Sequence, residues 1–142
     1  MAITFGPTKW HPSYQEFVIQ TASLGSAVLG GLMICRNGGT AWIIAPASTE
    51  VSRNWYSLND AVTTANANAA CGDWFVPTIG PLINPGYECR TYWDSYSSTA
   101  YWSSSETTGS VASVFLFQAA IASNGYNKAN VHCVRAMRCV AY

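Results

Sequence analysis

The feature that most constrains this chain is a glycine-rich turn between two short apolar runs. The run at residues 32–35 leads into Arg-Asn-Gly-Gly at 36–39, and a second apolar run follows at 40–45. Asn-Gly between apolar runs is a strong signal for an antiparallel hairpin, because a tight turn needs residues that accept positive φ. We therefore predict a β-hairpin over residues 30–46, ended by Pro46.

One convincing helix is predicted, from Ser57 to Ala70. Ser57 and Asp60 have the spacing of a capping box, and Gly72 lies where a helix stop is expected. Apolar residues recur at spacings of three and four, which places them on one helical face: Trp55, Leu58, Val62, Ala65 and Ala69. Because most of these residues are small, we expect the helix to lie close against a sheet.

The rest of the chain predicts short strands and one long loop. Residues 73–78 look extended, and residues 79–100 are rich in turn residues without a clear period, which is typical of a functional loop. Two antiparallel strands are predicted at 111–119 and 131–141, with a turn at 123–127 between them. The fold class expected is α+β, with short antiparallel sheets, one main helix and long irregular loops.

Charged residues make up only 10% of the chain and cancel to a net charge of zero, against a usual ~25% charged residues. A basic footprint is absent, so we expect no nucleic-acid partner. The longest weakly polar run, 26–35, is too short to cross a membrane, so no membrane insertion is expected. The first residues do not read as a secretory signal, which predicts synthesis in a cytosol.

Residues 1–23 are predicted to form an N-terminal arm ahead of a domain at 24–142. Pro7 and Pro12 interrupt regular structure, while Trp10, Tyr14 and Phe17 are apolar without a clear period. Two interpretations stay open. The arm docks on a neighbouring subunit, giving a homo-oligomer or a complex with other virion proteins, or it is the first strand of the domain's own sheet.

Three sequence boxes follow the hairpin and helix in order. They are Gly-Asp-Trp-Phe-Val-Pro-Thr at 72–78, Tyr-Trp-Ser-Ser-Ser-Glu at 101–106 and Arg-Cys-Val-Ala at 138–141. With the strand at 30–34, they resemble the C-type-lectin-like domains of bacterial and phage surface proteins, over about residues 25–142. In that family the first box reads Gly-Asp-Trp-Arg-Leu-Pro-Thr and the last Arg-Cys-Val-Arg.

The resemblance implies a C-type-lectin-like fold, and with the charge-poor chain it looks most like versions carried on tailed-phage virions. Phe75 and Val76 replace the family's Arg-Leu. Pro81, Pro85 and Gly86 argue against more than a turn where the family usually forms a second helix. The loop is therefore expected to be remodelled, and family binding details do not carry over there.

Five residues are expected to line an outer binding face, because Tyr gives contact area at low entropic cost. They lie in loops predicted around 84–100 and 124–128: Tyr92, Asp94, Tyr96, Tyr126 and Asn127. These loops are expected to bind a host-surface carbohydrate or protein.

No catalytic residue, metal or cofactor is expected. Sugar-binding C-type lectins hold Ca²⁺ with Glu-Pro-Asn and Trp-Asn-Asp, but here Ile83 precedes Asn84-Pro85 and no second acid follows Asp94. Adjacent His132 and Cys133 point to opposite strand faces, which disfavours zinc.

Other polar and reactive side chains are expected to be structural. The five cysteines are interpreted as small buried residues, with Cys71–Cys139 and Cys35–Cys89 bridges as alternatives. Trp74 and Trp102 are expected in the core, with Asp73 and Ser103 as partners of their ring N–H groups. Three arginines are expected to pair with Asp73, Asp94 or Glu106: Arg90, Arg135 and Arg138.

Two functions are therefore expected. The first is a non-enzymatic virion surface protein, on a tail fibre or capsid, that recognises a host-surface glycan or protein through its loops. The second is a purely structural decoration or cement subunit with no receptor role. In both, the location is the virion.

Overall fold

The computed structural model describes residues 12–68 and 73–142, which form two mostly antiparallel sheets with few helices. The α+β prediction is confirmed at that level. The first sheet has the order β1-β2-β3-β9, with strands Ala27–Val28, Gly31–Asn37, Thr40–Ile44 and Met137–Ala141. The second has the order β4-β8-β5-β6-β7, with strands Val51–Arg53, His132–Val134, Ala100–Glu106, Val111–Leu116 and Ile121–Asn127.

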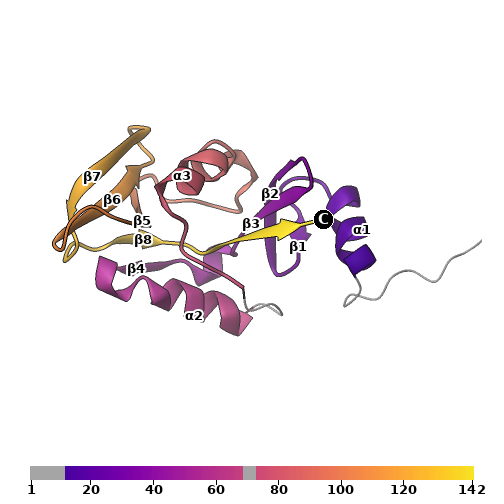
Figure 1. Ribbon diagram of the computed structural model, residues 1–142, viewed down its shortest axis with the longest axis horizontal. Coiled ribbons are helices and arrows are strands. Elements are labelled where there is room, and N and C mark those ends of the chain that lie inside the picture. Colours follow the sequence, from indigo (N-terminus) through magenta and orange to yellow (C-terminus); the bar gives the residue numbers. More distant parts are fainter. Residues whose placement is uncertain (1–11, 69–72) are drawn as a thin grey trace, which may run out of the picture.

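The two sheets lie one after the other along the long axis of the molecule (Figure 1). Helix α1 (Pro12–Thr21) and the C-terminus lie at one end, beside the first sheet, and the β6–β7 hairpin forms the other end. Helix α2 (Asn59–Asn68) runs along one side and the short α3 (Ile79–Pro81) lies on the opposite side.

The predicted hairpin is confirmed as β2 and β3. Asn37 pairs with Thr40, and Gly38 and Gly39 take φ values of 56° and 93° in the turn. Gly31, at the start of β2, is required for another reason. A Cβ there would lie 2.3 Å from the carbonyl oxygen of Ile44 and 2.9 Å from the ring of Trp74. Only glycine allows the two strands and the tryptophan to approach this closely.

The predicted helix is observed as α2, entered through a 3₁₀ turn, η2 (Trp55–Ser57). Its last predicted residues, Ala69 and Ala70, lie outside the described part of the chain. Ala65 is buried, as the spacing predicts, in the core that contains Met33, Ile43 and Trp74, called the first core from here on. Ala61 is buried in a separate core, beside Trp102 of the second sheet. Small residues thus let one helix pack against both halves of the molecule.

The prediction for the end of the chain is wrong in two respects. The segment 123–127 is not a turn but part of β7, because the reversal occurs at 117–120, where Ala120 has a φ of 54°. The predicted strand at 131–141 is two strands in different sheets: β8 pairs with β4 and β5, and β9 pairs with β3. The break at Arg135 and Ala136 carries the chain from one sheet to the other.

The segment 79–100 is not without structure. After α3 it forms a π-type turn, η3 (Leu82–Tyr87), with non-helical backbone at Asn84, and then a 3₁₀ turn, η4 (Arg90–Tyr92). As predicted from Pro81, Pro85 and Gly86, no long helix forms in this segment. The backbone departs from helical geometry at Asn84, between short helical turns.

Part of the predicted arm belongs to the body of the protein. Residues 1–11, which include Trp10, lie outside the described residues. Helix α1 packs Ile19, 0% exposed, into the first core, while Phe17 on the other side is 57% exposed. Arg36 of β2 donates to the carbonyl oxygens of Ile19 and Ala22 at 2.6 and 2.9 Å, which caps the end of the helix. The helix is therefore anchored to the first sheet, and a docking role for residues 1–23 stays a prediction.

Both faces of the first sheet are buried. Because successive side chains of a strand point to opposite faces, neighbouring residues of β2 lie in different cores. Met33 packs toward α1 and Trp74, and Ile34 packs toward Leu82, Trp93 and Tyr101. No helix among residues 12–68 and 73–142 is long and apolar enough to span a membrane.

Candidate functional site

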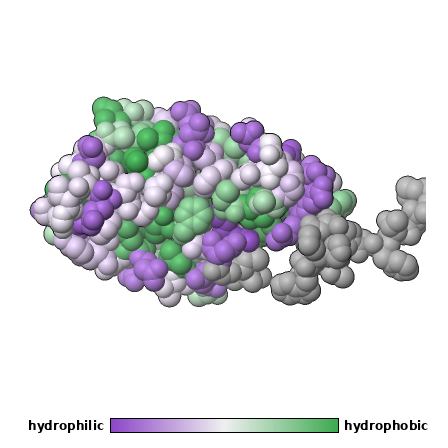
Figure 2. Space-filling model, in the orientation of Figure 1, coloured by the Kyte–Doolittle hydropathy of each residue, from purple (hydrophilic) through white to green (hydrophobic). Residues whose placement is uncertain are grey.

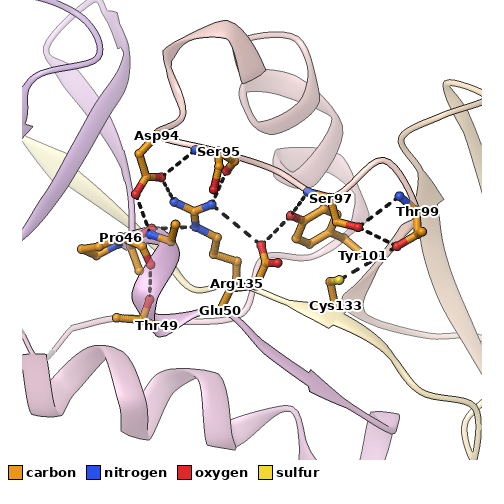
Figure 3. A network of polar contacts seen from close by, with 12 residues as sticks. Pro46, Thr49, Glu50, Asp94, Ser95, Ser97, Thr99, Tyr101, Cys133 and Arg135 are labelled. Atoms are coloured by element: carbon orange, nitrogen blue, oxygen red, sulfur yellow. Dashed lines mark hydrogen bonds and ion pairs between the residues drawn. The ribbon is translucent and has the colours of Figure 1, made fainter.

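A buried arginine organises the loop that sequence analysis placed at the binding face (Figure 3). Arg135, between β8 and β9, is 3% exposed. Its Nε donates to the carbonyl oxygen of Ala45 at 2.7 Å, one Nη donates to that of Ser95 at 2.5 Å, and the other donates to the carboxylate of Asp94. The guanidinium therefore ties the start of the 94–99 loop to the end of β3.

Asp94 is an anchor of this network. Its carboxylate also accepts a hydrogen bond from the backbone amide of Ala47 at 2.7 Å. Burial by itself would raise the pKa of Asp94, but the hydrogen bonds from Ala47 and Arg135 outweigh it, so the pKa lies below its ordinary value of 3.8. Asp94 is ionised at neutral pH, and its carboxylate is held by these hydrogen bonds, while its ligand-binding role stays a prediction.

Tyr101 of β5 fixes the other end of the loop. Its hydroxyl donates to Oε1 of Glu50 at 2.5 Å and accepts from the backbone amide of Ser97 at 2.8 Å. Burial, and then the neighbouring Glu50, raise the pKa of Tyr101 far above its ordinary value, so the hydroxyl keeps its proton. Through these two hydrogen bonds the Tyr101 hydroxyl joins Glu50 to the backbone of Ser97 and so positions the loop.

Beside the fixed loop lies an open groove of about 510 Å³, called the groove from here on. Its walls come from the start of β5, the end of β6, β7 and the start of β8, and its lining residues are Ser98, Thr99, Ala100, Leu116, Gln118, Ala119, Tyr126 and His132. None of these residues carries a formal charge when His132 is neutral, so the groove offers hydroxyl, amide and ring surfaces.

Three of the groove side chains are available to a ligand. Ser98, Gln118 and Tyr126 have no side-chain hydrogen bond with any residue that the structure describes, and Ser98 and Gln118 are exposed. Thr99, by contrast, bonds to Ser97 Oγ at 2.7 Å and links the groove to the Arg135 network. A ligand in the groove would therefore meet free donors and acceptors on a wall that the protein holds in place.

His132 lines the groove beside Tyr126. Its ring packs edge-on against Trp102 and Tyr126, with centroids 4.9 and 5.3 Å apart. Burial lowers the pKa of His132 below 6.5, so the imidazole is neutral at physiological pH. Its Nε2 atom is buried and has no hydrogen-bond partner among the described residues.

The five predicted binding residues do not form one surface. Tyr126 lines the groove, whereas Asp94 borders a second hollow of about 410 Å³ beside residues 27–32 and Pro46. Tyr92 is 40% exposed beside Gly25, and Tyr96 is 45% exposed with its ring against Trp93. Asn127, at the end of β7, is exposed, but its Oδ1 accepts from the amide of Ala129 at 2.8 Å.

Sequence reasoning missed Ser98, Gln118 and His132. Ser98 and Gln118 carry no local signal beyond being polar residues next to strands. His132 was considered only as a metal ligand. Among residues 12–68 and 73–142 no three His, Cys, Asp or Glu side chains gather as a metal site would require.

The expected ion pairs are observed for two of the three arginines. Arg138 donates to Asp73 at 2.5 Å and Arg135 pairs with Asp94, but Arg90 instead lies over the ring of Tyr87, 4.0 Å from its centroid. Glu106 pairs with Lys128, whose side chain is 2% exposed.

The expected tryptophan partners are wrong, although both rings are buried. Trp102 donates to the carbonyl oxygen of Arg53 at 3.0 Å, and Trp74 Nε1 has no partner among the described residues. The carbonyl oxygen of Ser103 accepts instead from Trp55.

Weakly polar residues cover much of one face of the protein (Figure 2). Much of the face seen in Figure 2 is pale and weakly polar, with apolar groups interspersed.

No protein-family model matches the chain, and no curated protein matches it. Function therefore has to be argued from the site itself.

Proposed function

We propose that this protein is a C-type-lectin-like, non-enzymatic surface domain of a virion, and that it recognises a host-surface glycan or protein through the groove. The observation that carries the proposal is a groove with uncharged walls in which Ser98, Gln118 and Tyr126 keep free hydrogen-bonding groups. Neutral sugars are bound by such hydroxyl and amide groups together with an aromatic ring.

The lectin-like part of the proposal is supported by the order of elements. The β2–β3 hairpin is followed by α2, by Trp74 in an extended segment that bridges to β9, and by β5, which contains the Tyr-Trp-Ser-Ser box. The Arg-Cys-Val box lies in β9, in the centre of the contact with β3. These are the family's boxes in the family's order.

The position of the groove supports a receptor role. It lies in the second sheet, whereas α1 and the C-terminus lie at the opposite end of the molecule (Figure 1). A domain attached to a particle through its terminal end would present the groove outward.

The binding test uses an array of neutral and charged oligosaccharides with the purified protein. The double variant Tyr126→Phe with Gln118→Ala keeps the ring and removes two hydrogen-bonding groups, so binding to the recognised glycan should weaken about tenfold or more. Tyr92→Phe is the matched control, since Tyr92 is exposed outside the groove, and it should bind as the unchanged protein does. Equal binding by all three proteins would reject the groove.

The structural alternative is favoured by a different observation. Four large apolar side chains are more than half exposed, and a subunit contact would cover them: Phe17, Tyr56, Ile121 and Val131. A cryo-electron microscopy map of the parent particle separates the two roles. The groove faces solvent in a receptor-binding protein and is buried between subunits in a cement protein.

A further inference from the structure

Two cysteines from distant parts of the chain lie where the 79–100 segment packs against strand β2. Cys35 lies in β2, and Cys89 lies where η3 ends and η4 begins. Strand β2 contacts both η3 and η4. Both thiols are half-buried against the core formed by Ile34, Leu82 and Trp93. The two side chains lie close enough for Cys35 to raise the pKa of Cys89.

The surroundings of Cys89 favour its protonated thiol. Burial raises the pKa of Cys89, and the neighbouring Cys35 and Glu88 raise it further, so this thiol is protonated at neutral pH. Thiol–disulfide exchange requires a thiolate, so attack by Cys89 on a disulfide is slow near neutral pH and becomes faster as the pH rises. Both cysteines are free thiols in the structure.

We propose that Cys35 and Cys89 form an intramolecular disulfide when the protein meets a glutathione-disulfide-type oxidant, and that this bond fastens the 82–92 segment to the first sheet. One cysteine, as its thiolate, attacks a sulfur of the oxidised glutathione, forms a mixed disulfide and releases one glutathione. The second cysteine loses its proton and attacks the protein sulfur of that mixed disulfide, releasing the second glutathione. Two protein thiols are oxidised, and one glutathione disulfide is reduced to two thiols.

The consequence of this bond is a restraint on a long stretch of chain. The cross-link joins residues 54 apart in sequence, so it removes conformational freedom from the unfolded state. It also holds η4, which leads directly into Trp93 and the loop anchored by Arg135. The inference is independent of what the groove binds.

The test incubates the full-length protein with oxidised glutathione and then labels free thiols with a maleimide under denaturing conditions. We expect a mass loss of two hydrogen atoms and one peptide pair joined through Cys35 and Cys89. The melting temperature should rise by about 5–15 °C over the reduced protein. Cys133 and Cys139 should remain labelled.

Variants provide the controls. Cys35→Ser and Cys89→Ser should each abolish the cross-link and the thermal shift, whereas Cys139→Ser, at an exposed position, should retain both. If a variant fails to fold, the peptide map of the unchanged protein still decides the question. The proposal is overturned if Cys35 and Cys89 stay fully labelled in oxidised, folded protein, if either carries only glutathione, or if the bond joins other cysteines.

Discussion

At the scale of single residues, buried charges hold the binding-side loop of this protein. The side chain of Arg135 is 1% exposed, and its nearest acid, Asp94, is 35% exposed. A guanidinium so enclosed depends on its partners, since removing one of them leaves a buried charge that water cannot reach. Asp94, which sequence analysis predicted as a contact for a ligand, therefore also has a structural role as a partner of Arg135.

Asp94→Asn should lower the free energy of unfolding by about 1–3 kcal/mol, because it removes the closer of the two acids that pair with Arg135 and leaves Glu50 at 3.8 Å. The change is measured by urea unfolding at neutral pH. Because the folded pKa of Asp94 lies below 3.8, its contribution is present above that pH and is lost as the pH falls further. Glu88→Gln, at an exposed position in the same segment, is the control and should be near neutral. Equal stability of both variants would show that the contact between Asp94 and Arg135 does not stabilise the fold.

His132 should make stability depend on pH in the weakly acidic range. Its folded pKa is below 6.5, so between about pH 6.5 and the folded pKa the unfolded chain binds a proton that the folded protein resists. The free energy of unfolding should therefore fall as the pH is lowered through this range. His132→Gln should flatten this part of the stability curve. Identical pH profiles for the two proteins would show that His132 is not shielded as described.

At the scale of elements, helix α1 completes the first core, and the crossing between β8 and β9 links the two sheets. Helix α1 covers the first sheet, and β8 and β9 place consecutive segments in different sheets. Arg135 and Ala136 lie at this crossing, and the backbone carbonyl of Ala136 accepts from the amide of Ala45 at 2.9 Å. Each sheet thus receives a strand from the last part of the chain, which makes the C-terminal segment a shared element.

Ile19→Ala should lower the free energy of unfolding by about 2–4 kcal/mol, because it empties a fully buried site in the first core. Phe17→Ala lies on the same helix at a position 57% exposed and should change stability by about 0.5 kcal/mol or less. Thermal and urea unfolding of both variants measure the difference. Two equally mild variants would mean that α1 detaches in solution, as a separate arm would.

At the scale of the whole molecule, charged side chains are few, and most of those in the described residues form ion pairs within the protein. Lys128 pairs with Glu106 and lies 4.2 Å from the centre of the Trp55 ring, and Arg138 pairs with Asp73. What remains on the surface is largely hydroxyl, amide and aromatic groups. Association with a partner should therefore depend weakly on salt, unlike binding led by charge.

A chelator should change neither the melting temperature nor glycan binding. The described residues bring no three His, Cys, Asp or Glu side chains together, and Asp94 is engaged with Arg135 and Ala47. Without a bound ion, no metal-binding free energy adds to folding. Calorimetry and the oligosaccharide array, each with and without EDTA, measure this. A lower melting temperature in EDTA that Ca²⁺ restores would contradict the prediction.

The sequence by itself determined the features that depend on neighbours along the chain. The Asn-Gly-Gly turn specified the β2–β3 hairpin, and the three-and-four spacing of small residues specified α2 and its buried Ala65. These are short-range effects of backbone sterics and side-chain period, so they are readable from a few consecutive residues. An ion pair at Arg135 was also expected, with Asp73, Asp94 and Glu106 as the candidate acids, because charged residues are few; the structure shows that the partner is Asp94.

Only the tertiary structure decided which strands pair and where the site lies. An alternating run such as 131–141 has the same pattern whether it is one strand or two, and its division between sheets depends on contacts with β3, β4 and β5. The groove is assembled from Ser98, Gln118, Tyr126 and His132, which lie on different elements. A surface built from residues far apart in sequence leaves no local period to detect, because its chemistry exists only once distant strands are side by side.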